Sequence, residues 1–173
     1  GPLGSGKGGG VELTLKSLVT GLLEQGHSVD IVAPKNSVLP EACNQAHLYC
    51  VSGADQPSWQ HQDVHSPILI PKNSLLIAMI EKAINLGKNA DIILNFSYDW
   101  IPIWMTLNID IPMAHIVSMG SESLEINNLI AKIYSIYPLN FAFHSFTQAS
   151  DYPYIKNPII IGNGFKLSNY NFK

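Results

Sequence analysis

A glycine-rich segment near the start of the chain is the first feature whose residues could do chemistry. Gly8, Gly9 and Gly10 lead directly into apolar residues with helical spacing that begin at Val11. Backbone N–H groups and the helix dipole make such a junction an anion site, and glycines let a phosphate approach closely. Glu12 completes a Gly-Gly-x-Glu pattern. The alternative interpretation is a flexible, glycine-rich terminus without function.

The same segment also matches the first part of a P-loop. Gly1, Gly6 and Lys7 have the spacing of that motif, but Gly8 stands where a Ser or Thr must hold magnesium. No apolar run of Walker B type follows. Residues 1–5 have two open origins, native loop or the remnant that a tag-removing protease leaves, and the second would make the match an artefact.

Aromatic and acidic side chains follow a predicted buried strand at 91–96. Asn95 lies in that strand, and Tyr98, Asp99 and Trp100 come directly after it. Ligands of open parallel sheets bind beyond the carboxyl ends of the strands. Two aromatic rings there could stack on a flat heterocycle while the carboxylate of Asp99 hydrogen-bonds it. The alternative makes Asp99 a loop cap and Trp100 a core residue.

Two further predicted strands end in polar groups. Ser118 follows the strand at 111–117, and His144 ends the strand at 141–145. His144 could face a ligand cleft or have a structural role. His115 lies inside its strand, where a histidine is more often a packed core residue than a catalyst.

A cluster of possible metal ligands lies in a predicted loop. His61, Asp63 and His65 alternate there, but a zinc site needs a third and fourth partner at suitable spacing. Cys43 and Cys50 do not supply such partners in any zinc pattern. We interpret the segment as a solvated loop and expect no metal.

Helices and strands alternate along the chain, which predicts the elements that position these residues. Apolar periodicity and glycine stops predict helices at 11–25, 73–86 and 124–137, with a short helix or turn at 100–107. Asn73 is the expected cap of the second helix, and Ser121 or Ser123 that of the helix from 124. Strands are predicted at 28–34, 47–51, 91–96, 111–117, 141–145 and 158–161, and a long loop is predicted at 53–71.

Strands separated by helices indicate an α/β fold, a Rossmann-like parallel sheet with helices on both faces. A glycine loop that opens a helix normally follows a first, central strand, and we expect that strand to be missing here.

Composition restricts the class of protein. Among the 173 residues, 46% are hydrophobic and only 13% are charged, so a full core is expected. The net charge is -3, arginine is absent and the lysines are scattered, which argues against nucleic-acid binding. No apolar run has the length of a membrane span, and no signal peptide opens the chain. The two cysteines could form only one disulfide, too few to stabilise a domain of this size. We therefore expect a reducing, cytoplasmic location.

The order of these motifs carries a resemblance to a known family. Gly9-Gly10-Val11-Glu12, a helix, and Gly26-His27-x-Val29 resemble the opening of bacterial group 1 glycosyltransferases of the GT-B fold. Ile161-Gly162-Asn163-Gly164-Phe165 is similar to the segment closing their first domain, with Gly162 for the usual Pro and Lys166 for the usual Asp. Within the group, residues 95–100 and 114–121 resemble the UDP-glucose:tetrahydrobiopterin glucosyltransferase-like subgroup.

The resemblance implies the acceptor-side half of a two-domain enzyme. Such an enzyme transfers glucose from a nucleotide sugar, UDP-glucose, to a pterin hydroxyl with retention of configuration and without a metal or other cofactor. Many group 1 enzymes place a catalytic His after the strand at 111–117, where this chain has Ser118. Ser118 and Asp99 are therefore the catalytic candidates. The implied substrate-binding residues are Gly8, Gly9, Gly10, Glu12, Asn95, Tyr98, Trp100, Met119, Gly120, Ser121, His144, Asn163 and Gly164.

The implied domain organisation has three parts. Residues 1–10 form the glycine-rich loop, 11–164 the Rossmann-like domain, and 165–173 the start of a linker to an absent donor-binding domain. The fragment alone is expected to be inactive. A P-loop-like nucleotide-binding module and a non-catalytic α/β binding domain remain the alternatives.

Overall fold

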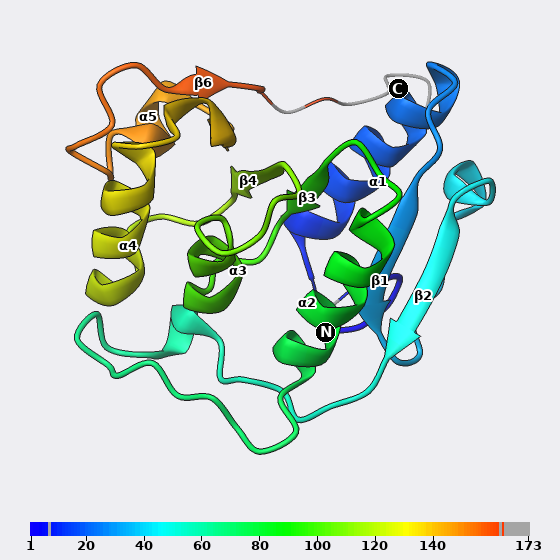
Figure 1. Cartoon of the computed structure of the whole chain (residues 1–173), viewed down its shortest axis with the longest axis horizontal. Helices are drawn as coiled ribbons and strands as arrows, with labels where there is room; N and C mark the ends of the chain where they lie inside the picture. Colours follow the sequence, from blue (N-terminus) through cyan, green and yellow to red (C-terminus); the bar gives the residue numbers. More distant parts are fainter. Residues whose placement is uncertain (7, 163, 165–173) are drawn as a thin grey trace, which may run out of the picture. The chain divides into compact units, whose positions relative to one another are not determined.

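The chain folds into two compact units, each built from parallel strands and helices. The computed structural model describes residues 1–6, 8–162 and 164. Gly1–Ser52 belongs to one unit, and Gly53–Gly162 forms the other. Figure 1 shows the helices and strands of each unit along the chain. Helices flank parallel sheets, which confirms the predicted α/β, Rossmann-like class.

The first unit contains one long helix and a two-stranded sheet. Helix α1 (Gly10–Glu24) precedes strands β1 (Asp30–Pro34) and β2 (His47–Val51), which pair in parallel, and the 3-10 helix η1 (Glu41–Cys43) lies between the strands. Gly26, at φ 83°, ends α1 as predicted, because its left-handed backbone lets the N–H groups of residues 26 and 27 bond back to the last turn. The core of this unit is made by Val19, Ile31, Ala33, Cys43 and Ala46.

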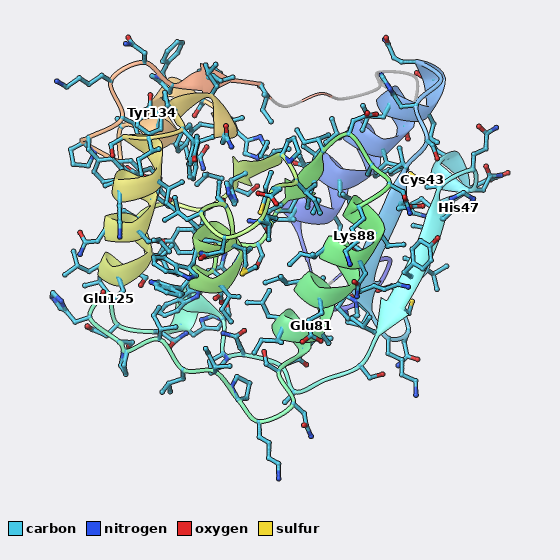
Figure 2. The ribbon with its side chains drawn as sticks, in the orientation of Figure 1. Cys43, His47, Glu81, Lys88, Glu125 and Tyr134 are labelled. Carbon is cyan, nitrogen blue, oxygen red and sulfur yellow. The ribbon has the colours of Figure 1, made fainter. Side chains whose placement is uncertain are left out.

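One cross-strand pair lies at the start of this small sheet. His47 on β2 lies opposite Asp30 on β1, and His47 Nδ1 is 3.1 Å from Asp30 Oδ1. Figure 2 labels His47 on this strand. Both side chains are well exposed, so the pair contributes little to stability.

The second unit carries a four-stranded parallel sheet in the order β3-β4-β5-β6. Its strands are β3 (Ile93–Asn95), β4 (Met113–Val117), β5 (Phe141–Phe143) and β6 (Ile159–Ile160). The helices of this unit are α2 (Leu75–Gly87), α3 (Trp100–Met105), α4 (Leu124–Tyr134) and α5 (Phe146–Ala149), with 3-10 turns η2 (Trp59–His61) and η3 (Pro138–Asn140).

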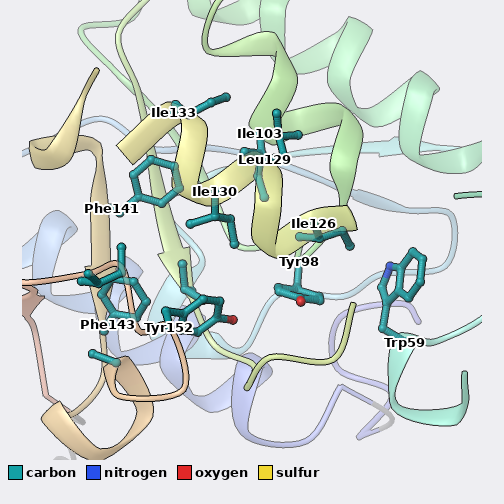
Figure 3. Close-up of a cluster of buried hydrophobic side chains, with 13 residues drawn as sticks. Trp59, Tyr98, Ile103, Ile126, Leu129, Ile130, Ile133, Phe141, Phe143 and Tyr152 are labelled. Atoms are coloured by element: carbon teal, nitrogen blue, oxygen red, sulfur yellow. The ribbon is translucent and has the colours of Figure 1, made fainter. Parts of the chain in front are cut away.

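The core of the second unit lies between α4 and the sheet. Ile126, Ile130 and Ile133 on one face of α4 are fully buried, together with Phe141 and Phe143 of β5. Figure 3 shows these side chains gathered around α4 and β5. Burying each such side chain is worth about 1.5–3 kcal/mol, so this interface fixes α4 on the sheet.

Helix caps differ from prediction in one place and agree in another. Ser74, not Asn73, caps α2: its Oγ accepts a hydrogen bond from Ile77 N at 3.4 Å, while Asn73 has a left-handed backbone with φ 57°. The Ser74 backbone, with φ -51° and ψ 126°, is non-helical, as that of a cap residue is, and it places the Ser74 hydroxyl next to Ile77 N. Ser123, one of the two predicted serines, caps α4 by accepting from Ile126 N.

A few short elements differ from the prediction. Residues 53–71 hold η2 and a parallel bridge between Ala54 and Ser74, where the sequence predicts only loop. Helix α5 is four residues long, too short for an apolar period to show. Helix α4 ends at Tyr134 instead of 137, because the N–H groups of residues 136 and 137 both turn back to Ile133 O.

Candidate functional site

The carboxyl ends of the parallel strands bring polar side chains to one edge of the second unit. Asn95 ends β3, Ser118 follows β4, His144 follows β5, and Gly162 comes after β6. Because the strands are parallel and adjacent in the sheet, these positions share the edge where ligands of such sheets bind.

Ser118 and His144 form a hydrogen-bonded pair at this edge. Ser118 Oγ lies 3.0 Å from His144 Nε2, and His144 Nδ1 lies 3.1 Å from Gly162 O. A carbonyl oxygen can only accept, so Nδ1 carries the proton and donates it. In a neutral ring Nε2 then accepts from the Ser118 hydroxyl. Both side chains are partly exposed, so a ligand can reach the pair.

Gln148 holds the two strand ends together. Its Oε1 accepts from His144 N at 2.9 Å, and its Nε2 donates to Val117 O at 2.6 Å and Met119 O at 3.0 Å. One amide therefore joins the residues that flank Ser118 to the backbone of His144. Sequence reasoning missed this role, because Gln148 bonds residues about 30 positions away and no local pattern marks such a contact.

A buried tyrosine, Tyr152, fixes the loop that begins at Ser118. Tyr152 Oη lies 3.0 Å from Met119 O and 2.9 Å from Gly120 O, so its proton is shared between the two carbonyls. Burial raises the pKa of Tyr152 far above its ordinary value, which keeps it a neutral donor. Ser121 Oγ accepts from Asn127 Nδ2. The loop is thus held rigidly before any ligand binds.

Asp99, a predicted catalytic residue, is a helix cap in this structure. It is 5% exposed, and its Oδ1 accepts from Ile101 N at the start of α3. Its Oδ2 accepts from Gln56 Nε2 at 3.2 Å, and the Trp59 side chain also donates to it. Burial raises the pKa of Asp99 above its ordinary value. Protein donors occupy the carboxylate, which favours the loop-cap alternative; a substrate role stays a prediction.

The aromatic neighbours of Asp99 have other contacts. Tyr98 is buried, donating its hydroxyl proton to Asn127 Oδ1 at 2.9 Å and accepting from Ser123 N. Trp100 stacks on Trp104 with ring centroids 5.1 Å apart. None of these contacts links Tyr98 or Trp100 directly to Ser118 or His144.

The buried His115 joins Asn95 and Thr106 in a chain of polar contacts that begins at the site edge. Asn95 Nδ2 lies 3.0 Å from His115 Nδ1, and His115 Nε2 lies 2.7 Å from Thr106 Oγ1. His115 is 2% exposed and stacks on Phe141. Burial lowers the pKa of His115 to about 4, so its ring is neutral near pH 7. This arrangement fits the core role expected for His115, and it ties up the amide of Asn95.

The glycine loop of the first unit is closed by its own glutamate. Glu12 Oε2 accepts from Gly4 N at 3.0 Å, and its Oε1 accepts from Gly8 N at 2.7 Å. The Gly8 hydrogen bond above all lowers the pKa of Glu12. A carboxylate therefore already occupies donors that a phosphate would use, which disfavours the P-loop interpretation. Gly9 caps α1 at φ 53° without a side-chain hydrogen bond, and Gly10 is its first residue.

The remaining predicted residues add little to the site. Gly164 is exposed, and Asn163 lies outside the described residues, as does the predicted linker 165–173. Among the described residues, no three His, Cys, Asp or Glu side chains are placed to hold a metal ion. His65 N donates to Asp63 Oδ1 in a turn, as in the solvated loop expected for this segment.

Comparisons with known proteins leave the family open. Neither the protein-family models nor the curated proteins give a match to this chain. In the part of the chain that the structure describes, no helix combines the length and apolarity that crossing a membrane requires. The geometry of the site is therefore the main guide to function.

Proposed function

We propose that the chain is the acceptor-binding part of a retaining, nucleotide-sugar-dependent glycosyltransferase of the GT-B type. In this proposal the donor is UDP-glucose, the acceptor is a pterin, and a second α/β domain binds the donor. The observation that carries the proposal is the Ser118–His144 hydrogen bond at the carboxyl ends of β4 and β5. The order of the sequence motifs, from the Gly-Gly-x-Glu loop to residue 164, supports it as well.

The Ser118–His144 pair suits an acceptor hydroxyl. Ser118 Oγ donates to His144 Nε2 and keeps free lone pairs, so it can accept a hydrogen bond from an incoming hydroxyl. As the acceptor hydroxyl reacts, its proton passes to Ser118 Oγ while the Ser118 proton passes to His144 Nε2. Ser118 thus takes the position that the family gives to a histidine, and His144 supplies the imidazole from the next strand.

The acceptor site is expected to be preorganised. Tyr152 and Gln148 hold Met119 and Gly120 in place, so these residues can border a flat ring without ordering on binding. The proposal needs neither metal nor cofactor in this part of the protein. Two free cysteines, Cys43 and Cys50, fit a cytoplasmic location, because reducing compartments keep thiols unpaired.

Binding to the chain itself tests the proposal. Tetrahydrobiopterin and UDP-glucose are titrated separately, and binding is followed by calorimetry and by the NMR signals of His144. We expect the pterin to shift those signals and UDP-glucose to bind weakly, with no glucosylated product from the chain alone. Ser118→Ala should weaken pterin binding about tenfold, which corresponds to one lost hydrogen bond of roughly 1.4 kcal/mol.

A matched control separates a site effect from a general one. Ser150→Ala removes an exposed hydroxyl that bonds Thr147 O, and it should leave pterin affinity unchanged. The assigned site would be rejected if Ser118→Ala left the pterin affinity unchanged, or if pterin binding shifted no NMR signal of His144. Glucosylated pterin formed by the chain alone would reject the assignment of donor binding to another domain.

A further inference from the structure

Ser118 has the hydrogen-bonding environment of an activated nucleophile. A serine hydroxyl is a weak nucleophile unless an adjacent base accepts its proton. His144 Nε2 is 3.0 Å from Ser118 Oγ, within the range of nucleophile–base pairs, and it is in the tautomer that can accept. Gly162 O takes the part of the third, orienting group, since it fixes Nδ1 as the protonated nitrogen.

The loop after Ser118 supplies backbone donors. Met119 O and Gly120 O both bond to Tyr152 Oη, and no peptide bond of the described residues is cis. Across a trans peptide the N–H points opposite to the C=O, so the N–H groups of Gly120 and Ser121 point away from the tyrosine hydroxyl. Among the described residues neither N–H has a backbone acceptor. A backbone N–H group without such an acceptor is able to donate to an oxyanion.

We propose that Ser118 and His144 form a catalytic nucleophile–base pair that takes acyl groups from activated esters, an activity separate from the proposed sugar transfer. Ser118 Oγ attacks the ester carbonyl carbon and its proton passes to His144 Nε2. The carbon–oxygen bond to the alcohol breaks, the alcohol oxygen leaves with the bonding electrons, and it takes the proton from Nε2. Water then attacks the acyl-serine, with His144 again accepting the proton. The acyl–serine bond breaks, Ser118 Oγ takes that proton back, and the carboxylic acid is released.

Hydrogen bonds from Gln148 fix the backbone around Ser118 and His144, which favours a catalytic pair over a chance contact. Gln148 bonds the backbone on both sides of Ser118 and the backbone N of His144. The two reacting side chains therefore stand on strand ends that one amide holds in register. A base accelerates the reaction of a neighbouring nucleophile most when the structure already holds the two groups in the reactive geometry.

Covalent labelling of the intact chain tests the proposal. The probe is an alkyl fluorophosphonate, which phosphonylates activated serines with loss of fluoride. We expect one adduct per chain, mapped to Ser118 by peptide mass spectrometry, and p-nitrophenyl acetate hydrolysis that the adduct abolishes. Ser118→Ala should remove both signals. His144→Gln, which keeps a hydrogen-bond acceptor but no base, should slow labelling at least about 100-fold.

Two comparisons make the test decisive. Ser150→Ala changes an exposed serine outside the pair and should label at the wild-type rate. The wild-type chain is tested directly as well: a folded chain that gives no adduct, or an adduct at another residue, overturns the proposal. Equal labelling rates in folded His144→Gln and wild type overturn it too. Because no pterin or nucleotide sugar is present, these outcomes are independent of the proposed function.

Discussion

At the scale of single residues, the surroundings of Glu12 and Asp99 shift the pKa values of their carboxyl groups in opposite directions. Glu12 accepts backbone hydrogen bonds in its charged form, which lowers its pKa. Asp99 is buried, and burial disfavours its charged form and raises its pKa. The two groups should therefore respond to pH with opposite sign.

Glu12 should hold the glycine loop only while it is ionised. Its pKa in the folded chain lies below the ordinary 4.5, so the contribution of its hydrogen bonds is present above pH 4.5 and is lost as the pH falls through the folded value. We expect the NMR signal of the Gly8 amide to titrate with a midpoint below 4.5. Glu12→Gln should remove this titration and speed amide exchange at Gly8; an unchanged exchange rate would contradict the contact.

Asp99 should make the chain less stable as the pH rises. Its pKa is raised in the folded chain, so its contribution to stability is present below the ordinary 3.8 and is lost as the pH rises through the folded value. Asp99→Asn keeps a capping oxygen and removes the charge. Denaturant unfolding should show wild type losing stability relative to this variant as the pH rises above 3.8. A parallel pH dependence of both proteins would place the carboxylate in contact with solvent instead.

His115 gives a third pH dependence. Its pKa falls from 6.5 to about 4 in the folded chain, so the unfolded chain binds the proton more tightly. The stability that the neutral ring confers is full above pH 6.5 and is lost as the pH falls toward 4, by roughly 3 kcal/mol. In His115→Gln, unfolding free energies measured from about pH 7 to about pH 4 should lack this loss. A variant with the wild-type slope would assign the loss to other groups.

At the scale of elements, Gly53 and Gly21 differ in whether the surrounding structure leaves room for a side chain. A Cβ on Gly53 would lie 2.4 Å from Leu75 Cα and 2.5 Å from Leu75 N, where the bridge between Ala54 and Ser74 closes. Gly21 lies inside α1, and a Cβ there meets nothing within 4 Å. The first position is closed to side chains by backbone atoms, and the second is open.

Alanine at these two positions should change stability in opposite directions. Gly53→Ala must displace the start of α2 and should destabilise the chain by about 1–3 kcal/mol, as overpacking does. Gly21→Ala should stabilise it by about 0.5–1 kcal/mol, because alanine loses less backbone entropy in a helix. Urea unfolding of both variants measures the difference. A neutral Gly53→Ala would mean that the 53–54 segment does not pack against α2.

Gly9, at the start of α1, is explained by its backbone conformation and not by a close approach of other atoms. Its φ of 53° is a backbone conformation that side chains rarely adopt, although no atom lies within 4 Å of an added Cβ. The conformation itself, more than any close approach, explains a glycine here. A bulky residue at position 9 would therefore act on the helix start as well as on any ligand.

At the scale of the whole molecule, the two units have separate cores. The core of the second unit is built from residues between Trp59 and Ile155, and that of the first from residues between Val19 and Ala46. Each unit also has its own sheet, of four and two strands. Separate cores and separate sheets are the marks of units that can fold alone.

Residues 53–162 should therefore fold as an isolated polypeptide. The segment contains the complete four-stranded sheet, helices α2 to α5 and the Ser118–His144 pair. We expect a cooperative thermal transition and dispersed NMR signals for its buried methyl groups, such as those of Ile126 and Ile130. A polypeptide that binds hydrophobic dyes and unfolds without a transition would show that the first unit is required for its fold.

Local sequence signals were enough to predict the main elements and the edge of the site. Apolar periodicity predicts α1, α2 and α4, and the glycine stop predicts the end of α1, because these signals act within a few residues. Strand β2 agrees with its prediction at both ends. Alternation of strands and helices implies a parallel sheet, and so predicts that Ser118 and His144 share an edge.

The contacts of those residues, in contrast, depend on the tertiary fold. The bond from Ser118 to His144 spans 26 positions, and the bonds from Tyr152 to the loop span more than 30, so strand register and helix packing set them rather than local pattern. The same holds for Asp99: its place after a strand predicts a ligand site, whereas its burial and its hydrogen bonds from Gln56 and Trp59 come from the tertiary fold. Side-chain types are fixed by the chain, whereas their partners depend on which strands come to lie side by side.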